Sequence, residues 1–201
     1  YDFEAGLSDD TLSQNWNFSP QVGDFNGDGE LDLLLASDFG TSVVMQGAGD
    51  GTFVNITDRS IITDENGMGS ALGDYDNDGK VDFYVVNNGE ESYEDGSDRH
   101  GVLFHNDSTS GGWLKVKLQG TTSNRDAFGT KLKLVAGGKT QIREHVSGEG
   151  YFSSNAQEVH FGLGDAEIID SLTITWPTGK SIVMTDIKVN QTLTVVEDSY
   201  D

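Results

Sequence analysis

Two acidic stretches, residues 24–32 (the first loop) and residues 74–82 (the second loop), have the residue types and spacing that wrap a calcium ion. Calcium takes about six to eight oxygen ligands at roughly 2.3–2.6 Å, and a short loop supplies them when oxygen-bearing side chains occupy alternate positions. The side chains that meet this need are Asp24, Asn26, Asp28 and Asp32 in the first loop, and Asp74, Asp76, Asp78 and Asp82 in the second. The backbone carbonyls of Glu30 and Lys80 are expected as further ligands, so the sequence predicts two Ca²⁺ sites.

Other cation sites fit the two loops less well. An EF-hand would need a glutamate at the twelfth loop position and a helix after it, but Leu35 and Val85 stand there within apolar runs. Magnesium retains waters in a rigid octahedron, and zinc prefers histidine or cysteine. Gly29 and Gly79 stand where the loop must reverse with a positive φ. The alternative to a calcium site is an acidic surface that only aids solubility.

Two properties of the calcium sites follow from the crowding of their carboxylates. An unfilled loop holds like charges together, so calcium is expected to add to the stability of the fold. The second loop has four side-chain carboxylates, whereas the first has three and an asparagine. Because affinity depends on the number of charged ligands, we expect the second loop to bind calcium more tightly.

The loops belong to an internal duplication. A shift of 50 positions aligns VGDFNGDGELDLLLAS at residues 22–37 with LGDYDNDGKVDFYVVN at residues 72–87. The short apolar runs that follow each loop predict buried strands. Residues 43–46 then match residues 102–105, so the shift grows from 50 to 59 and the second copy carries a nine-residue insertion.

The insertion lies within a polar and acidic segment, residues 88–100. Loops that outgrow their repeat often carry binding function. This segment could therefore form a third calcium site or the lip of a ligand site, and Tyr93, Glu94 and Asp95 are its candidate ligand-binding residues. A tolerated surface insertion is the plainer interpretation.

Composition excludes several classes of protein. The 201 residues carry a formal net charge of −22, and residues 1–110 hold 23 of the 34 acidic residues but 3 of the 12 basic ones. Such an acidic part would repel phosphate, so no nucleic-acid partner is expected. Cysteine is absent, and no run approaches the roughly 18 apolar residues of a membrane helix. The chain begins at Tyr1 without a signal peptide, as a mature or excised piece of a longer protein would.

The second half has the alternation of short strands. Residues 113–119 and 130–134 alternate apolar side chains with lysines. Further strands are predicted at residues 141–146, 159–163, 171–176, 181–187 and 192–196. Together they predict an all-β fold with a C-terminal β-sandwich. Trp113 and Trp176 are expected in its core, and the lysines at 115, 117, 131 and 133 on a solvated face, with a basic face for an anionic glycan as the alternative.

Several motifs resemble a known pairing of domains. The first half resembles FG-GAP/VCBS repeats, in GDxxxDGxxD at residues 23–32 and 73–82 and in GDGTF at residues 49–53. The second half resembles the ASPIC/UnbV domain of the cartilage acidic protein family, in SNRDAFGT at residues 123–130, GEGYFSSN at residues 148–155, HFGLG at residues 160–164 and WPTGK at residues 176–180. The resemblance implies a secreted or surface protein with calcium in its repeat loops, and it implies no settled activity.

The expected architecture is two FG-GAP/VCBS-type calcium-binding β repeats, residues 1–110, packed on an ASPIC/UnbV-like sandwich, residues 111–201. Such repeats usually close a propeller of about seven blades, which two repeats cannot do. We therefore expect the two parts to form one compact unit, as a monomer or within a larger multidomain chain.

The function favoured is extracellular recognition, and no enzyme is expected, with a glycan-active enzyme that uses paired carboxylates as the least favoured alternative. The chain has four histidines, no cysteine and no GxSxG elbow. A glycan or a cell-surface protein is the expected partner, since sugars are held by aromatic platforms with carboxylates or calcium. Trp16 and Tyr93 are candidate platforms, although Trp16 could instead pack its own loop, and Arg125 and Asp126 either line a site or pair structurally. The alternative is a calcium-stiffened interaction or spacer domain of an adhesin without a sugar site.

Overall fold

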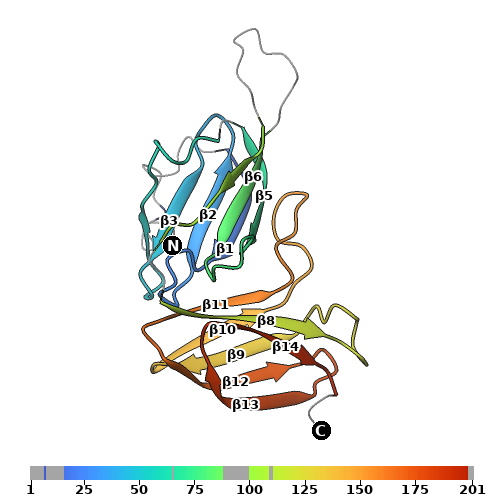
Figure 1. Cartoon of the computed structure of the whole chain (residues 1–201). Helices are drawn as coiled ribbons and strands as arrows, with labels where there is room; N and C mark the ends of the chain where they lie inside the picture. Colours follow the sequence, from blue (N-terminus) through green and yellow to red (C-terminus); the bar gives the residue numbers. More distant parts are fainter. Residues whose placement is uncertain (1–6, 8–15, 65, 88–99, 109–110, 199–201) are drawn as a thin grey trace.

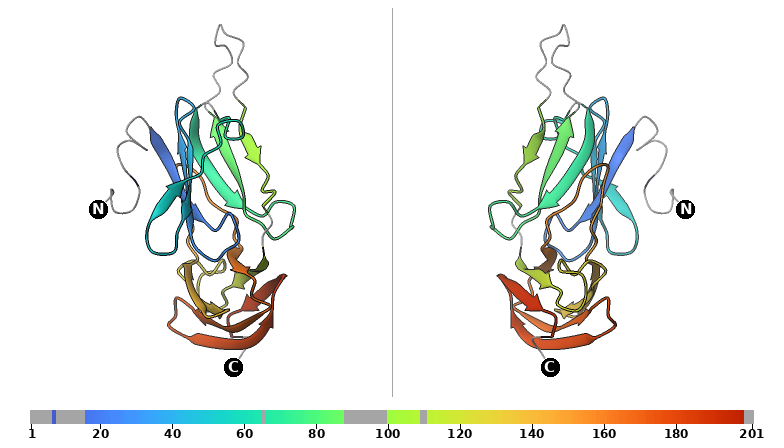
Figure 2. Two further views of the ribbon diagram at one scale, coloured as in Figure 1. Left: turned by 90° about the vertical axis from the view of Figure 1, so that its left-hand side faces the viewer. Right: turned by 90° about the vertical axis from the view of Figure 1, so that its right-hand side faces the viewer.

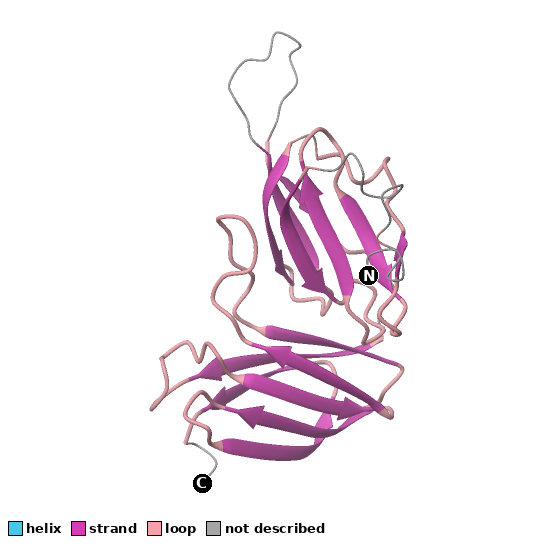
Figure 3. Ribbon diagram, turned by 180° about the vertical axis from the view of Figure 1, so that it is seen from behind, coloured by secondary structure: helices cyan, strands magenta, loops and turns pink. Residues whose placement is uncertain are grey.

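The described part of the chain consists of strands and their connections (Figure 1). The computed structural model describes residues 7, 16–64, 66–87, 100–108 and 111–198. Within these ranges it contains fourteen β-strands and no helix (Figure 3). The predicted all-β fold is therefore confirmed. No helix of the described residues is long and apolar enough to cross a membrane.

The repeat region, β1–β7, shows the duplication in its backbone. One sheet has the order β1-β2-β3-β4 and the other the order β5-β6-β7. Their bounds are β1 Asn17–Gly23, β2 Asp32–Ser37, β3 Val43–Gly47, β4 Phe53–Asn55, β5 Gly67–Gly73, β6 Asp82–Asn87 and β7 Val102–Phe104. The first hairpin of one sheet pairs Gly23 with Asp32, and that of the other pairs Gly73 with Asp82. The register of each hairpin also shifts at the same place, after Asn17 and after Gly67. Each hairpin therefore presents its acidic loop at the same end.

The C-terminal sandwich, β8–β14, contains the predicted strands. Their bounds are β8 Gly112–Gln119, β9 Lys131–Ala136, β10 Lys139–Glu144, β11 Val159–Gly164, β12 Ile168–Thr175, β13 Ser181–Lys188 and β14 Gln191–Val196. One sheet has the order β10-β9-β12-β13 and the other the order β11-β8-β14, in which β14 runs parallel to β8. Each predicted range overlaps one of these strands, because alternation of apolar and polar residues marks a sheet with one buried face.

Apolar faces account for the packing of both parts. Leu34, Leu72 and Val85 belong to the core between the two sheets of the repeat region. Leu134 and Phe161 are fully buried within the sandwich, where Trp176 also lies, as predicted. Burying one such side chain fully stabilises a fold by about 1.5–3 kcal/mol. The hairpin ends of the repeat region can therefore carry polar loops without loss of the core.

Those loops meet the sandwich. In Figures 1 and 2, β8 and β11 lie beneath the lower ends of the repeat-region strands. The Gly164 amide donates to the Gly27 carbonyl at 2.8 Å, and the Ala156 amide donates to the Leu72 carbonyl at 2.8 Å. The division into domains at residues 110 and 111 stays a prediction, but the contacts place both acidic loops against the C-terminal sandwich.

Candidate functional site

The first loop is a tight turn held by its own side chains. Asp24 accepts hydrogen bonds from the amides of Asp28 and Gly29, at 3.1 and 2.9 Å. Asp28 accepts from the Glu30 amide at 2.8 Å and from the Asn26 side chain at 2.9 Å. Gly29 has a φ of 92°, which disfavours any residue with a side chain. These bonds draw Asp24, Asn26 and Asp28 into one turn, but among the described residues the first-loop carboxylates do not form a group close enough to share a metal ion.

The second loop repeats this pattern. The Gly79 amide donates to Asp74 at 3.0 Å, the Asp78 amide to Asp76 at 3.1 Å, and the Lys80 amide to Asp78 at 2.9 Å. Gly79 has a φ of 93°, nearly that of Gly29. The predicted glycine role is therefore observed in both loops.

The last aspartate of each loop ties the turn to the following strands. Asp32 is 2% exposed and accepts from the amides of Phe25, at 2.7 Å, and Gly47, at 2.9 Å. Asp82 is equally buried and accepts from the amides of Tyr75, at 3.1 Å, and Asn106, at 2.8 Å. A carboxylate oxygen has more than one lone pair, so these bonds leave acceptor capacity for a cation.

The second loop contains acidic clusters that could hold a metal ion. The ligand atoms of Asp74, Asp76 and Asp82 lie within 4.8 Å of one another, and so do those of Asp76, Asp78 and His105. The Asp74 side chain is 2% exposed, and its Oδ1 is buried without a hydrogen-bond partner. A buried carboxylate oxygen is expected to have a partner, so the donor set fits a hard cation. His105 was not among the predicted ligands.

Burial makes the charged form of several of these carboxylates costly. Burial raises the pKa of Asp24 to about 6, and the negative charges of Asp28 and Asp32 add to this rise. Hydrogen bonds from the amides of Gly29 and Gly27 act in the opposite direction. Burial likewise raises the pKa of Asp32 and of Asp82. A cation among these groups would favour their ionised forms.

The sandwich contributes basic side chains to both loops. Lys115 Nζ lies 2.7 Å from Asp74 Oδ2, with side-chain exposures of 6% and 2%. Lys139 Nζ lies 2.9 Å from Glu30 Oε1 and donates to the Asp28 carbonyl at 3.0 Å. The prediction of a solvated face is therefore wrong for Lys115, because the second loop covers that end of β8.

Further contacts attach the second loop to β8 and β11. His160 Nε2 donates to the Gly79 carbonyl at 2.8 Å, so this histidine has a structural role. The indole of Trp113 lies directly against Gly79. Trp113 is half-buried, so its predicted place in the sandwich core is wrong. A cleft of about 240 Å³ between the loops and the sandwich is lined by Asp24, Asp74, Lys115, Arg143 and His160, among others.

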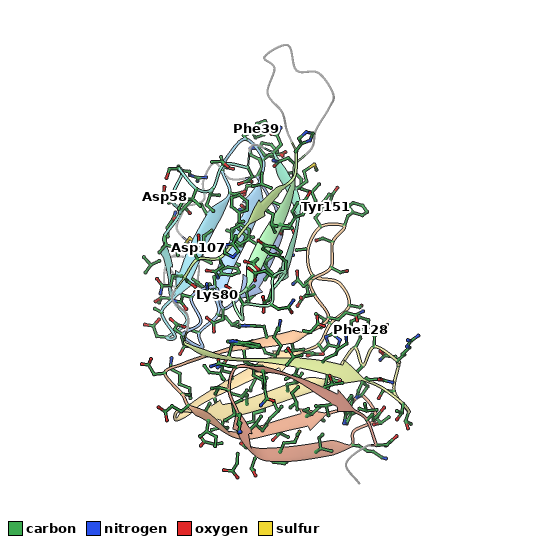
Figure 4. All side chains as sticks on the ribbon, in the orientation of Figure 1. Phe39, Asp58, Lys80, Asp107, Phe128 and Tyr151 are labelled. Atoms are coloured by element: carbon green, nitrogen blue, oxygen red, sulfur yellow. The ribbon has the colours of Figure 1, made fainter. Side chains whose placement is uncertain are left out.

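The other predicted ligand-binding residues lie apart from the loops. Trp16 is 64% exposed and meets Phe39 edge-on, with ring centroids 6.3 Å apart. Arg125 and Asp126 are exposed in the β8–β9 connection, which follows the end of β8 opposite to Trp113 (Figure 4 labels the neighbouring Phe128). Their backbone carbonyls accept hydrogen bonds from Gly120 and His145. Both residues thus support their own loop.

The remaining predictions fall outside the described residues. Tyr93, Glu94 and Asp95 belong to residues 88–99, and the suggested third calcium site depends on the same segment. The prediction for residues 88–100 therefore stays a prediction.

An aromatic group that sequence reasoning missed stands on the loop between β10 and β11 (Figure 4 labels Tyr151). Phe152 is 95% exposed with a φ of 51°, and Tyr151 meets it edge-on with ring centroids 4.6 Å apart. Tyr151 also packs against Phe18 at 5.8 Å. The two adjacent aromatic residues in GEGYFSSN were the signal available in the sequence. In the structure, an exposed Phe at positive φ is costly for the fold, which points to a functional reason for this conformation.

Comparisons with known proteins match both parts of the chain. The family model described as FG-GAP-like repeat matches residues 9–85, and the one described as ASPIC and UnbV matches residues 120–200. Cartilage acidic protein 1 of Xenopus tropicalis is 35% identical over 118 residues, and that of Homo sapiens is 31% identical over 117 residues. Each match covers 58% of this chain and 17% of the relative, so the chain corresponds to a small part of those proteins.

Proposed function

We propose that this chain, which combines an FG-GAP-like repeat region with an ASPIC and UnbV domain and is homologous to cartilage acidic protein 1, is a calcium-dependent extracellular recognition module. The observation that carries the proposal is the Asp74, Asp76 and Asp82 cluster, in which Asp74 Oδ1 is buried without a partner. The first loop repeats the same hydrogen-bonded turn.

Calcium is the cation that this donor set favours. The side chains offer carboxylate and amide oxygens, and the carbonyls of Glu30 and Lys80 are assigned as further ligands. A hard divalent cation bound there would neutralise the carboxylates. Asp32 and Asp82 would then hold the cation while they keep each loop joined to its strands, through the amides of Gly47 and Asn106.

Recognition of a glycan or a cell-surface protein is supported by the exposed aromatic side chains. Trp16 with Phe39, and Tyr151 with Phe152, present ring surface to solvent. Sugar rings stack on such platforms, and their hydroxyls pair with nearby polar groups. The homology and the FG-GAP-like repeats suggest an extracellular protein, secreted or on a cell surface. We assign the chain no enzymatic role, no nucleic-acid partner and no insertion into a membrane.

A second candidate function is a calcium-stiffened spacer or protein-interaction domain. It is favoured by the position of the loops, which contact the sandwich through Gly27 and Gly79 rather than opening toward solvent alone. A cation in either loop would then stiffen the contact between the repeat region and the sandwich without binding a ligand.

A glycan array in millimolar calcium and again in EDTA distinguishes the two functions. Binding that requires calcium and that Phe152→Ala abolishes supports the glycan module. No binding in either buffer, together with a calcium-dependent rise in melting temperature, supports the spacer. Hydrolysis of a glycan would show that the chain has enzymatic activity. A melting temperature that is the same with and without calcium would refute both calcium-dependent functions.

A further inference from the structure

The two loops differ in the protein cations that surround them. In the second loop, three successive acidic side chains each have a basic partner: Lys115 for Asp74 at 2.7 Å, His105 for Asp76 at 3.0 Å and Lys80 for Asp78 at 2.8 Å. In the first loop, within the described ranges, no lysine, arginine or histidine nitrogen lies within 4.0 Å of the carboxylates of Asp24 or Asp28. In the first loop Lys139 instead pairs with Glu30 and donates to the Asp28 carbonyl, so the two loops differ in which acidic side chains have a basic partner.

Lys115 is the most deeply placed of these cations. Its ammonium donates to Asp74 Oδ2 at 2.7 Å and to Asn77 Oδ1 at 2.9 Å, and it lies 5.3 Å from the centre of the Trp113 ring. In the first loop the position of Asn77 is occupied by Gly27, which has no side chain to hold an ammonium. The Lys115 site is therefore specific to the second repeat.

The ammonium must weaken the binding of a divalent cation at Asp74. If the cation displaces Lys115, a buried charge has to leave its carboxylate partner, which is unfavourable. If Lys115 stays on Oδ2 while the cation takes the free Oδ1, two positive charges share one carboxylate and repel each other. Both routes lower the affinity of the second loop.

We propose that Lys115 is the resident cation of the second loop and competes there with calcium. This proposal rests on the proposed calcium function, and it makes the affinity of the second loop lower than its carboxylate count alone predicts. Lys115 would keep the second loop docked on β8 when calcium is scarce, because it offsets Asp74 in the absence of a metal.

The test isolates the second loop with Asp28→Ala, which removes a first-loop carboxylate, and then adds Lys115→Met. Titration with calcium chloride by calorimetry gives the dissociation constant. Luminescence of terbium excited through Trp113, whose indole lies against Gly79, reports the second loop in the Asp28→Ala background. We expect Lys115→Met to tighten the second site by about tenfold or more, since removing a competing charge raises the effective ligand charge. Lys117→Met, on the exposed lysine two residues along β8, is the control and should leave the affinity unchanged.

A stability readout distinguishes competition from simple packing. Lys115→Met should melt at a lower temperature than the parent in EDTA and recover most of that loss in calcium, whereas loss of packing alone would persist in both buffers. An unchanged or weaker second site in Lys115→Met would overturn the proposal. If the parent chain bound no calcium at either loop, the proposed function itself would be wrong.

Discussion

Gly79 is the residue through which the joint between the second loop and the sandwich can be tested. A Cβ at Gly79 would overlap the indole of Trp113 at Nε1, Cδ1 and Cε2, and Gly79 has a φ of 93°. Gly79→Ala therefore combines backbone strain of about 1–2 kcal/mol with an overpacking cost of about 1–3 kcal/mol. The expected loss of about 2–5 kcal/mol corresponds to a melting temperature lower by about 4–20 °C for a chain of this size.

Gly29→Ala is the matched control. Gly29 has almost the same φ, 92°, but the nearest atom to its added Cβ would be Gln141 Nε2 at 3.1 Å, far from the overlap of 2.1 Å at Gly79. This variant should therefore lose about 1–2 kcal/mol, chiefly from backbone strain. Thermal melts of Gly79→Ala, Trp113→Ala and the double variant complete a cycle, in which Trp113→Ala should relieve much of the cost at Gly79. Equal losses for Gly79→Ala and Gly29→Ala would refute the predicted contact with the indole.

Three further predictions concern the metal, an acid-sensitive carboxylate and the exposed aromatics. Calcium at about 100 times its dissociation constant should stabilise the chain by about 2.7 kcal/mol per site. Each filled site should therefore raise the melting temperature by about 5–11 °C relative to EDTA. Identical melting temperatures in calcium and in EDTA would contradict the calcium sites. Burial raises the pKa of Glu197, but hydrogen bonds from Ser123, Thr121 and Thr178 outweigh it and hold that pKa at about 2. Its contribution to stability should therefore be complete above pH 4.5 and fall as the pH drops toward 2, and a pH series of melts should show a shallower acid slope for Glu197→Gln. Phe152 is 95% exposed, so Phe152→Ala should change stability by less than about 0.5 kcal/mol while it lowers ligand binding in the array.

The acidic turns and the strands could be predicted because their signals are local. The 50-residue duplication placed both turns, and period-two alternation placed the sandwich strands. The structure has Trp113 on the same face of β8 as Lys115 and Lys117, opposite to the sandwich core, so the core position predicted for Trp113 went against the alternation and is wrong. The alternation cannot say what covers that face. The second loop covers Trp113 and Lys115, whereas Lys117 lies beyond it and is exposed.

The position of the loops also couples calcium binding to the joint. Gly27 and Gly79 each accept a hydrogen bond from the sandwich, so a cation that orders either loop also orders its attachment. Coupling between two binding equilibria is reciprocal, so the proposed calcium binding and the attachment of each loop to the sandwich must affect each other to the same degree, with Lys115 opposing calcium in the second loop. A loop of nine residues read alone gives only the candidate metal ligands. Its affinity depends on residues such as Lys115 and His160, which are distant in sequence and meet the loop only after the sandwich has formed.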